Sequence, residues 1–143
     1  MLESLNYKKI SKSAKPTIGA EFLKKKVNLE DGTEVNLQLW DTAGQERFQS
    51  LCTSFYRGAD CCVLVFDLSA PESYESLESW RQSFLNTTGD LNQEVPMVII
   101  GNKADKGINI EKSKVLTEWV ESNKAKFYTE TSALKYLGIE DAF

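Results

Sequence analysis

The hydrophobic positions along the chain change period several times. Val35, Leu37 and Leu39 recur at every second position, a second β-rich run covers residues 27–29, and Asp31-Gly32 lies between the two runs. An Asp-Gly pair between alternating segments is a strong signal for a tight turn between antiparallel strands. The pattern predicts a β-hairpin over residues 27–40.

Two runs are continuously apolar instead of alternating. Residues 61–66 (Cys-Cys-Val-Leu-Val-Phe) and 95–100 (Val-Pro-Met-Val-Ile-Ile) have the length of strands and are rich in β-branched residues. Such runs predict strands that are covered on both faces. Residues 126–129 have the character of a short last strand.

Helical spacing separates these strands. Pro71 suits the first turn of a helix, and apolar residues then recur with a period near 3.6 at Tyr74, Leu77, Trp80, Phe84 and Leu85. The same spacing returns at Val115, Leu116, Trp119 and Val120, and a further helix is expected to begin near Ile139, Ala142 and Phe143. Strands that alternate with helices predict an α/β fold with a mostly parallel sheet, to which the hairpin adds an edge strand.

The amino-acid composition narrows the class of protein and the kinds of site that the chain can contain. The 143 residues are 41% hydrophobic and 27% charged, which is typical of one globular domain, and we expect residues 1–143 to form a single domain. The absence of His excludes His-based catalysis and zinc sites, and three Cys do not make a disulfide framework. The net charge of −4 does not show the excess of positive charge that is typical of nucleic-acid-binding proteins.

A first polar cluster, Asp41-Thr42-Ala43-Gly44-Gln45-Glu46, follows the second strand of the hairpin. Asp41 offers hard oxygens that suit Mg²⁺. Gly44 allows the backbone to approach a phosphate, and Gln45 can orient an attacking water. An ordinary strand–turn–helix corner is the alternative.

A second cluster, Asn102-Lys103-Ala104-Asp105, follows the strand at 95–100. The Asp105 carboxylate can accept hydrogen bonds from N1–H and the 2-amino group of guanine, a donor pair that adenine lacks. The Lys103 stem can lie along the base, and Asn102 can tie the loop to its neighbours. A polar loop at the end of a strand is the alternative.

Two further clusters are weaker signals. Small residues in Glu130-Thr131-Ser132-Ala133 would let backbone N–H groups reach the base, and Thr17 in Pro16-Thr17-Ile18-Gly19 could give its hydroxyl to Mg²⁺. Each alone is more typical of a plain loop. Because the carboxyl ends of parallel strands share one edge of a sheet, we expect the three clusters that follow strands to converge there.

Taken in order, Thr17, Asp41, Asn102 to Asp105 and Ser132-Ala133 resemble the motifs of small GTPases of the Ras superfamily. Within it, residues 40–48 (WDTAGQERF) and 55–60 (FYRGAD) resemble the Rab family, and residues 18–22 (IGAEF) match its effector loop. Residues 58–67 are similar to the late-endosomal and vacuolar Rab branch. The resemblance covers the whole chain.

The resemblance implies a G domain of the P-loop NTPase fold, GTP/GDP as ligand, Mg²⁺ as cofactor and GTP hydrolysis in vesicle traffic. It implies that Gln45 positions the hydrolytic water and that Thr17 and Asp41 hold Mg²⁺. The residues implied to bind GTP are Thr17, Gly44, Asn102, Lys103, Asp105, Ser132 and Ala133. Those implied to bind effectors are Ile18, Phe22, Trp40 and Phe55.

Further expectations follow from the same resemblance. Implied partners are effectors, exchange factors and GTPase-activating proteins, with no nucleic acid. The implied location is the cytosol and the cytosolic face of late endosomes, lysosomes or vacuoles, reached through a prenylated tail that the chain lacks.

The chain departs from the family at both ends. No Gly-x-x-x-x-Gly-Lys-[Ser/Thr] string, which cradles phosphates in this family, occurs in the sequence. We expect the first strand, the phosphate loop and the last helix to be absent, with residues 1–11 corresponding to the later part of the first helix. Two functions stay open here, a Rab GTPase and a non-catalytic module that keeps the effector-facing surface.

Overall fold

The structure is a computed structural model and describes residues 1–8, 16–45, 52–89, 95–122 and 125–143. Its strands are β1 (Ala20–Asn28), β2 (Glu34–Thr42), β3 (Cys62–Asp67), β4 (Met97–Asn102) and β5 (Phe127–Glu130). Its α-helices are α1 (Leu2–Tyr7), α3 (Pro71–Glu75), α4 (Leu77–Thr88) and α5 (Lys112–Val115). Short 3-10 helices cover Thr53–Phe55 and Ala104–Lys106, and a π-helix covers Leu116–Glu121.

The predicted hairpin is confirmed and is longer than the pattern indicated. β1 and β2 pair antiparallel along nine residues each, with Val27 opposite Val35. The Asp31 carboxylate accepts a hydrogen bond from the Thr33 backbone N–H at 2.8 Å, and Gly32 has φ +84°. The Asp-Gly pair therefore supplies both the side-chain acceptor and the positive φ that this turn requires.

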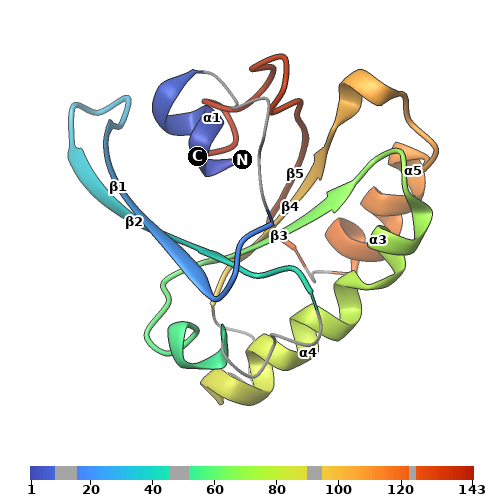
Figure 1. Cartoon of the computed structure of the whole chain (residues 1–143), viewed down its shortest axis with the longest axis horizontal. Coiled ribbons are helices and arrows are strands. Elements are labelled where there is room, and N and C mark those ends of the chain that lie inside the picture. The colour runs from blue at the N-terminus through green and yellow to red at the C-terminus, as the bar shows by residue number, and fades with distance from the viewer. Residues whose placement is uncertain (9–15, 46–51, 90–94, 123–124) are drawn as a thin grey trace.

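The parallel sheet is also confirmed. β3, β4 and β5 lie side by side in that order, all parallel, with Leu64 opposite Ile99 and Ile99 opposite Tyr128. The fold is therefore α/β (Figure 1). It differs from the expectation in one respect: in the described part of the chain the hairpin forms its own two-stranded sheet and does not extend the parallel sheet as an edge strand.

The separate hairpin changes the environment of β3. The side chains of Leu64 and Phe66 are buried, but those of Val63 and Val65 on the other face are 37% and 46% exposed. The prediction that this strand is covered on both faces is wrong for one face. A continuous apolar run shows that both faces can be buried, but the neighbouring elements decide whether they are.

The helices follow the predicted spacing with two differences. The first predicted helix is divided at Ser76 into α3 and α4, and Pro71 stands in the first turn of α3 as expected. The prediction of a helix near Ile139 is wrong: the described residues 139–143 form turns, and Ile139 is buried against Leu5. Burial of Ile139, and not helical periodicity, explains why this position is apolar.

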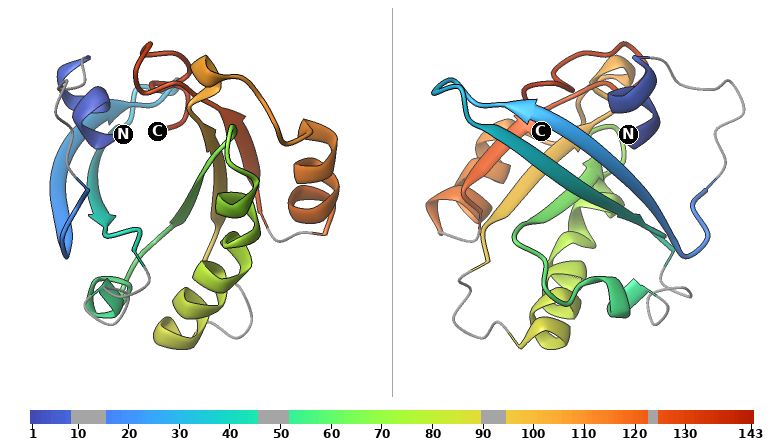
Figure 2. Two further views of the ribbon diagram at one scale, coloured as in Figure 1. Left: turned by 45° about the vertical axis from the view of Figure 1, so that its right-hand side comes forward. Right: turned by 90° about the vertical axis from the view of Figure 1, so that its left-hand side faces the viewer.

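Two hydrophobic clusters hold the chain together. The larger one lies between the parallel sheet and α3, α4 and α5. The smaller one surrounds Leu5 of α1, and it joins Leu23 and Leu39 of the hairpin to Ala133 after β5. Figure 2 shows α1 and both termini at the same end of the molecule, between the hairpin and the parallel sheet. Among the described residues no helix is long and apolar enough to cross a membrane.

Candidate functional site

Two loops meet at the carboxyl ends of β4 and β5. The side-chain oxygen of Asn102 accepts hydrogen bonds from the Thr131 hydroxyl and the Ala133 backbone N–H, each at 3.1 Å. The Ala104 backbone N–H donates to the Thr131 carbonyl at 3.0 Å. The predicted tie between Asn102 and the neighbouring loop is therefore confirmed, and the second and third clusters converge as expected.

Asp105 lies in the same place. Its carboxylate accepts a hydrogen bond from the buried hydroxyl of Ser132, which in turn accepts one from the Lys135 backbone N–H at 3.0 Å. Asp105 itself is exposed, and the Ser132 contact engages one of its two carboxylate oxygens. The loops thus present one oriented carboxylate beside small side chains, an arrangement that can read a base edge.

None of the site residues predicted from the sequence is Asp67, the last residue of β3. Its carboxylate forms an ion pair with Lys103 at 2.7 Å and accepts hydrogen bonds from the Ser69 hydroxyl and backbone N–H at 2.6 and 2.9 Å. Partial burial opposes ionisation, but these contacts outweigh it and lower the pKa of Asp67 to about 2. The available signal was its position directly after the apolar run 61–66, as Asp41 directly follows the second strand of the predicted hairpin.

Thr17 and Asp41 form a second group at the carboxyl end of β2. The Thr17 hydroxyl donates to the Asp41 carboxylate at 3.2 Å, and the Ala43 backbone N–H donates to the Gly19 carbonyl at 2.8 Å. The structure therefore brings these two residues together from segments 24 positions apart. Both side chains offer oxygen atoms as metal ligands. They therefore fit Mg²⁺, which keeps part of its water shell and needs few protein ligands.

Gly44 and Gln45 are exposed and line a cavity of about 810 Å³, together with Thr17, Asp41 and Val65. The cavity lies between the end of β2 and the strand β3, so it touches the open face of the parallel sheet. Glu46, the last residue of the first cluster, lies outside the described residues. Residues of the first cluster thus line this cavity beside β3. The second and third clusters, after β4 and β5, are joined to each other by hydrogen bonds of their own.

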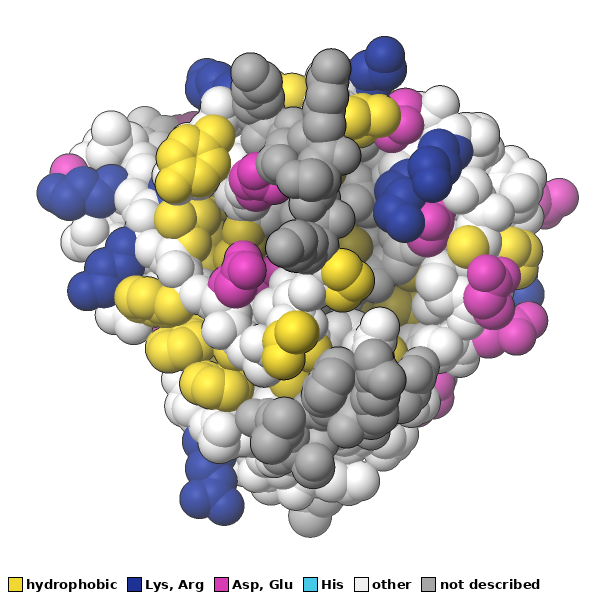
Figure 3. All heavy atoms as spheres, in the orientation of Figure 1, with side chains coloured by type: hydrophobic (Ala, Val, Ile, Leu, Met, Phe, Trp, Pro, Cys, Tyr) yellow, Lys and Arg dark blue, Asp and Glu magenta, His cyan; other side chains and the backbone are white. Residues whose placement is uncertain are grey.

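Three aromatic side chains form a row on the surface. The ring centroids of Phe22 and Trp40 are 4.6 Å apart, and those of Trp40 and Phe55 are 5.1 Å apart. Phe22 and Trp40 are 43% and 47% exposed, and the nearby Ile18 is 79% exposed. Figure 3 shows hydrophobic side chains grouped at the lower left, on the side of the hairpin. Trp40 is therefore displayed at the surface and is not part of the core.

Among the described residues there is no group of three or more His, Cys, Asp and Glu that could hold a metal ion. The Thr17–Asp41 pair itself offers a hydroxyl and a carboxylate oxygen, ligands of the hard type that Mg²⁺ prefers.

Comparison with known proteins agrees with this geometry. The family model described as "Ras family" matches residues 1–143. The chain is 48% identical over 140 residues to the Ypt/Rab-type GTPase ypt7 of Schizosaccharomyces pombe. This match covers 95% of the chain and 67% of that relative. It is 49% identical over 142 residues to the Ras-related protein RABG3e of Arabidopsis thaliana, covering 95% and 68%.

The Ras-related protein Rab7 of Drosophila melanogaster is 45% identical over 137 residues, covering 95% of the chain and 66% of that relative. The chain thus spans about two thirds of the length of these relatives. The match over all 143 residues, together with the converging loops after β4 and β5, shows that the chain belongs to the Ras family, in the Rab branch that includes Rab7 and Ypt7.

Proposed function

We propose that this protein is a GTP-binding and GTP-hydrolysing switch of vesicle traffic to the late endosome, lysosome or vacuole. The observation that carries the proposal is the pair of loops after β4 and β5, in which Asn102 joins the loops and Asp105 is held by Ser132. The Rab7- and Ypt7-type relatives support the same function, since ypt7 is itself named a GTPase.

Selectivity for guanine rests on the Asp105 carboxylate. One of its oxygens is engaged by Ser132, which leaves the other to accept from the donors on the guanine edge. Adenine would place an acceptor and no donor there, so one polar group would remain unpaired. Such a mismatch in a built hydrogen-bonding site discriminates by about 10⁴–10⁵. Lys103, Ser132 and Ala133 would line the remaining sides of the base.

The phosphates and the metal would be bound by the residues at and after the carboxyl end of β2. Thr17 and Asp41 would hold Mg²⁺, whose charge would offset the charge that develops on the phosphates during transfer. Gly44 would offer its backbone N–H to the terminal phosphate. Gln45, exposed at the rim of the cavity, would orient the attacking water.

The aromatic row would recognise effector proteins. Large exposed rings at the centre of a contact provide most of the binding free energy of many interfaces. Ile18, Phe22, Trp40 and Phe55 would form this surface, and exchange factors and GTPase-activating proteins would be the other partners. We place the protein in the cytosol and on the cytosolic face of late endosomal or vacuolar membranes, with residues 1–143 as one domain.

The base preference is the most direct test. Amide resonances of residues 102–105 and 131–133 are followed by NMR while GDP, GMP or ADP is added to the millimolar range. We expect GDP and GMP to shift these resonances and ADP to leave them unchanged. Equal shifts with ADP, or none with GDP, would contradict the proposal. Delivery of an endocytosed marker to the lysosome or vacuole in cells lacking the gene tests the cellular role.

A further inference from the structure

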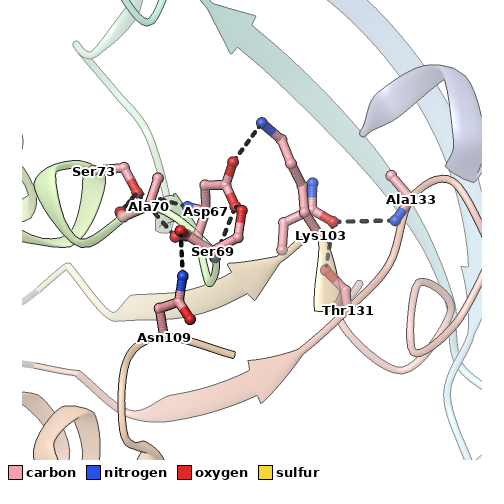
Figure 4. Close-up of polar contacts among 9 residues, drawn as sticks. Asp67, Ser69, Ala70, Ser73, Lys103, Asn109, Thr131 and Ala133 are labelled. Atoms are coloured by element: carbon pink, nitrogen blue, oxygen red, sulfur yellow. Dashed lines mark hydrogen bonds and ion pairs between the residues drawn. The ribbon is translucent and has the colours of Figure 1, made fainter. Parts of the chain in front are cut away.

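Asp67 divides its two carboxylate oxygens between different partners. One oxygen accepts both hydrogen bonds from Ser69 and so holds the turn after β3. The other is 2.7 Å from the ammonium group of Lys103. Figure 4 shows the Lys103 side chain reaching across to Asp67 from the neighbouring strand end. The carboxylate is only 16% exposed, so water screens this contact less than it would at the open surface.

The backbone on both sides of the ion pair is fixed. Asp67 lies opposite Asn102 in the parallel register, and its backbone N–H donates to the Ser73 hydroxyl at 2.9 Å. Lys103 follows Asn102 directly, and its carbonyl accepts from the Lys106 backbone N–H at 2.9 Å. The position of each Cα is thus set by the sheet and the loop, and the ion pair decides the direction of the Lys103 side chain.

Lys103 also has an unusual backbone conformation. Its φ is +64°, in the left-handed region that non-glycine residues avoid. Such a conformation persists where the surroundings over-determine it, and it is concentrated at binding sites. From this backbone the Lys103 side chain reaches the Asp67 carboxylate at the end of β3 (Figure 4).

We propose that Asp67 is a positioning residue that holds the Lys103 side chain in place for guanine binding. A free lysine samples many rotamers and must lose this freedom when a base packs against its stem. The ion pair removes most of that freedom before the ligand arrives, which lowers the entropic cost of binding. This inference rests on the proposed nucleotide function and adds to it a residue from β3, outside the loops that contact the base.

The substitution Asp67→Asn separates this role from the structural one. The amide oxygen of Asn can still accept from Ser69, but the group no longer carries the charge that attracts Lys103. The matched control Ser69→Ala removes the hydroxyl contact to Asp67 and leaves the ion pair intact. We expect Asp67→Asn to weaken GMP binding 5- to 10-fold in the NMR titration, and Ser69→Ala to change it less than 2-fold.

A double-substitution cycle identifies Lys103 as the mediator. In the background of Lys103→Met, which keeps an apolar stem without the charge, Asp67→Asn should change the affinity for GMP less than 2-fold. The ¹⁵N relaxation of the Lys103 ammonium group, measured without nucleotide, should show faster motion in Asp67→Asn and not in Ser69→Ala.

The outcomes separate two failures. Equal losses of affinity in Asp67→Asn and Ser69→Ala, or a loss that persists beside Lys103→Met, would overturn the positioning role and leave the guanine site standing. A wild-type chain that does not prefer GMP to AMP would overturn the proposed function and the positioning role together.

Discussion

The Asn102 side chain accepts the backbone N–H of Ala133 at 3.1 Å and thereby joins the loop after β4 to the loop after β5. The same oxygen also accepts the hydroxyl of the buried Thr131. Asn102 is therefore a structural element of the base site as well as a member of its motif. Its removal should affect folding and ligand binding together.

We expect Asn102→Ala to lower the free energy of unfolding by about 2–3 kcal/mol, because it leaves the Ala133 N–H and the Thr131 hydroxyl without their acceptor. Urea unfolding followed by circular dichroism measures this change. Asn86→Ala, on the exposed face of α4, is the matched control and should cost less than about 0.5 kcal/mol. Equal effects of the two substitutions would show that the loops are held together by other contacts.

Asp105→Asn should change the base preference from guanine toward xanthine. The amide can donate to the 2-oxo group of xanthine where the carboxylate can only accept, and its oxygen can still accept from Ser132, so the loop should stay folded. Competition between xanthosine and guanosine nucleotides in the same NMR titration measures the preference. Asp60→Asn, at an exposed position before β3, should keep the guanine preference. A preference for guanine retained by Asp105→Asn would remove Asp105 from the role of base reader.

In a chain that also carries a phosphate loop, Gln45→Leu should slow GTP hydrolysis and leave nucleotide affinity within about 2-fold. Leu has a similar size but cannot hydrogen-bond a water molecule. Hydrolysis is measured in a single turnover at saturating protein, and affinity in a separate titration. Gln38→Leu, on an exposed position of β2, is the control. An unchanged rate for Gln45→Leu would mean that another group orients the water.

Trp40→Ala should weaken the binding of a Rab effector by about 2 kcal/mol or more and leave hydrolysis nearly unchanged. The ring lies between Phe22 and Phe55 and is 47% exposed, so it contributes apolar contact area and no phosphate chemistry. Leu29→Ala, at the turn end of the hairpin and 50% exposed, is the matched control. Hydrolysis lost in a folded Trp40→Ala protein would contradict the separation of the two surfaces.

The ion pair of Asp67 predicts a dependence of stability on pH. Its pKa is lowered to about 2, below the ordinary value near 4, so the contribution of the carboxylate to stability is complete above about pH 4. That contribution is lost as the pH falls through the folded-state value. The free energy of unfolding should differ between wild type and Asp67→Asn by about 1–2 kcal/mol at pH 6. The difference should shrink from pH 4 to pH 2, and one that is constant over this range would contradict the ionic origin.

The parts of the fold that depend on local chemistry could be predicted from the sequence. The Asp31-Gly32 turn acts through neighbours in the chain, and its position is confirmed. Asn102 could be predicted from its place after an apolar run, and its tie to the loop after β5 is confirmed. The open face of β3 could not be predicted, because the exposure of Val65 depends on where the separate hairpin lies. The pairing of Asp67 with Lys103, 36 positions away, depends on the register of two parallel strands and has no local signal.

Helix α1 contacts both halves of the molecule. The Ser4 hydroxyl donates to the Ala133 carbonyl at 2.8 Å, and the Lys25 ammonium group of β1 donates to the Leu5 carbonyl at 3.1 Å. Any ligand that displaces α1 when it binds at the base loops therefore changes the affinity of the hairpin for its own ligands. Thermodynamic linkage requires the reverse effect to have the same size. An effector that binds the hairpin and moves α1 would therefore change the affinity for the nucleotide by the same factor by which the nucleotide changes the affinity for the effector.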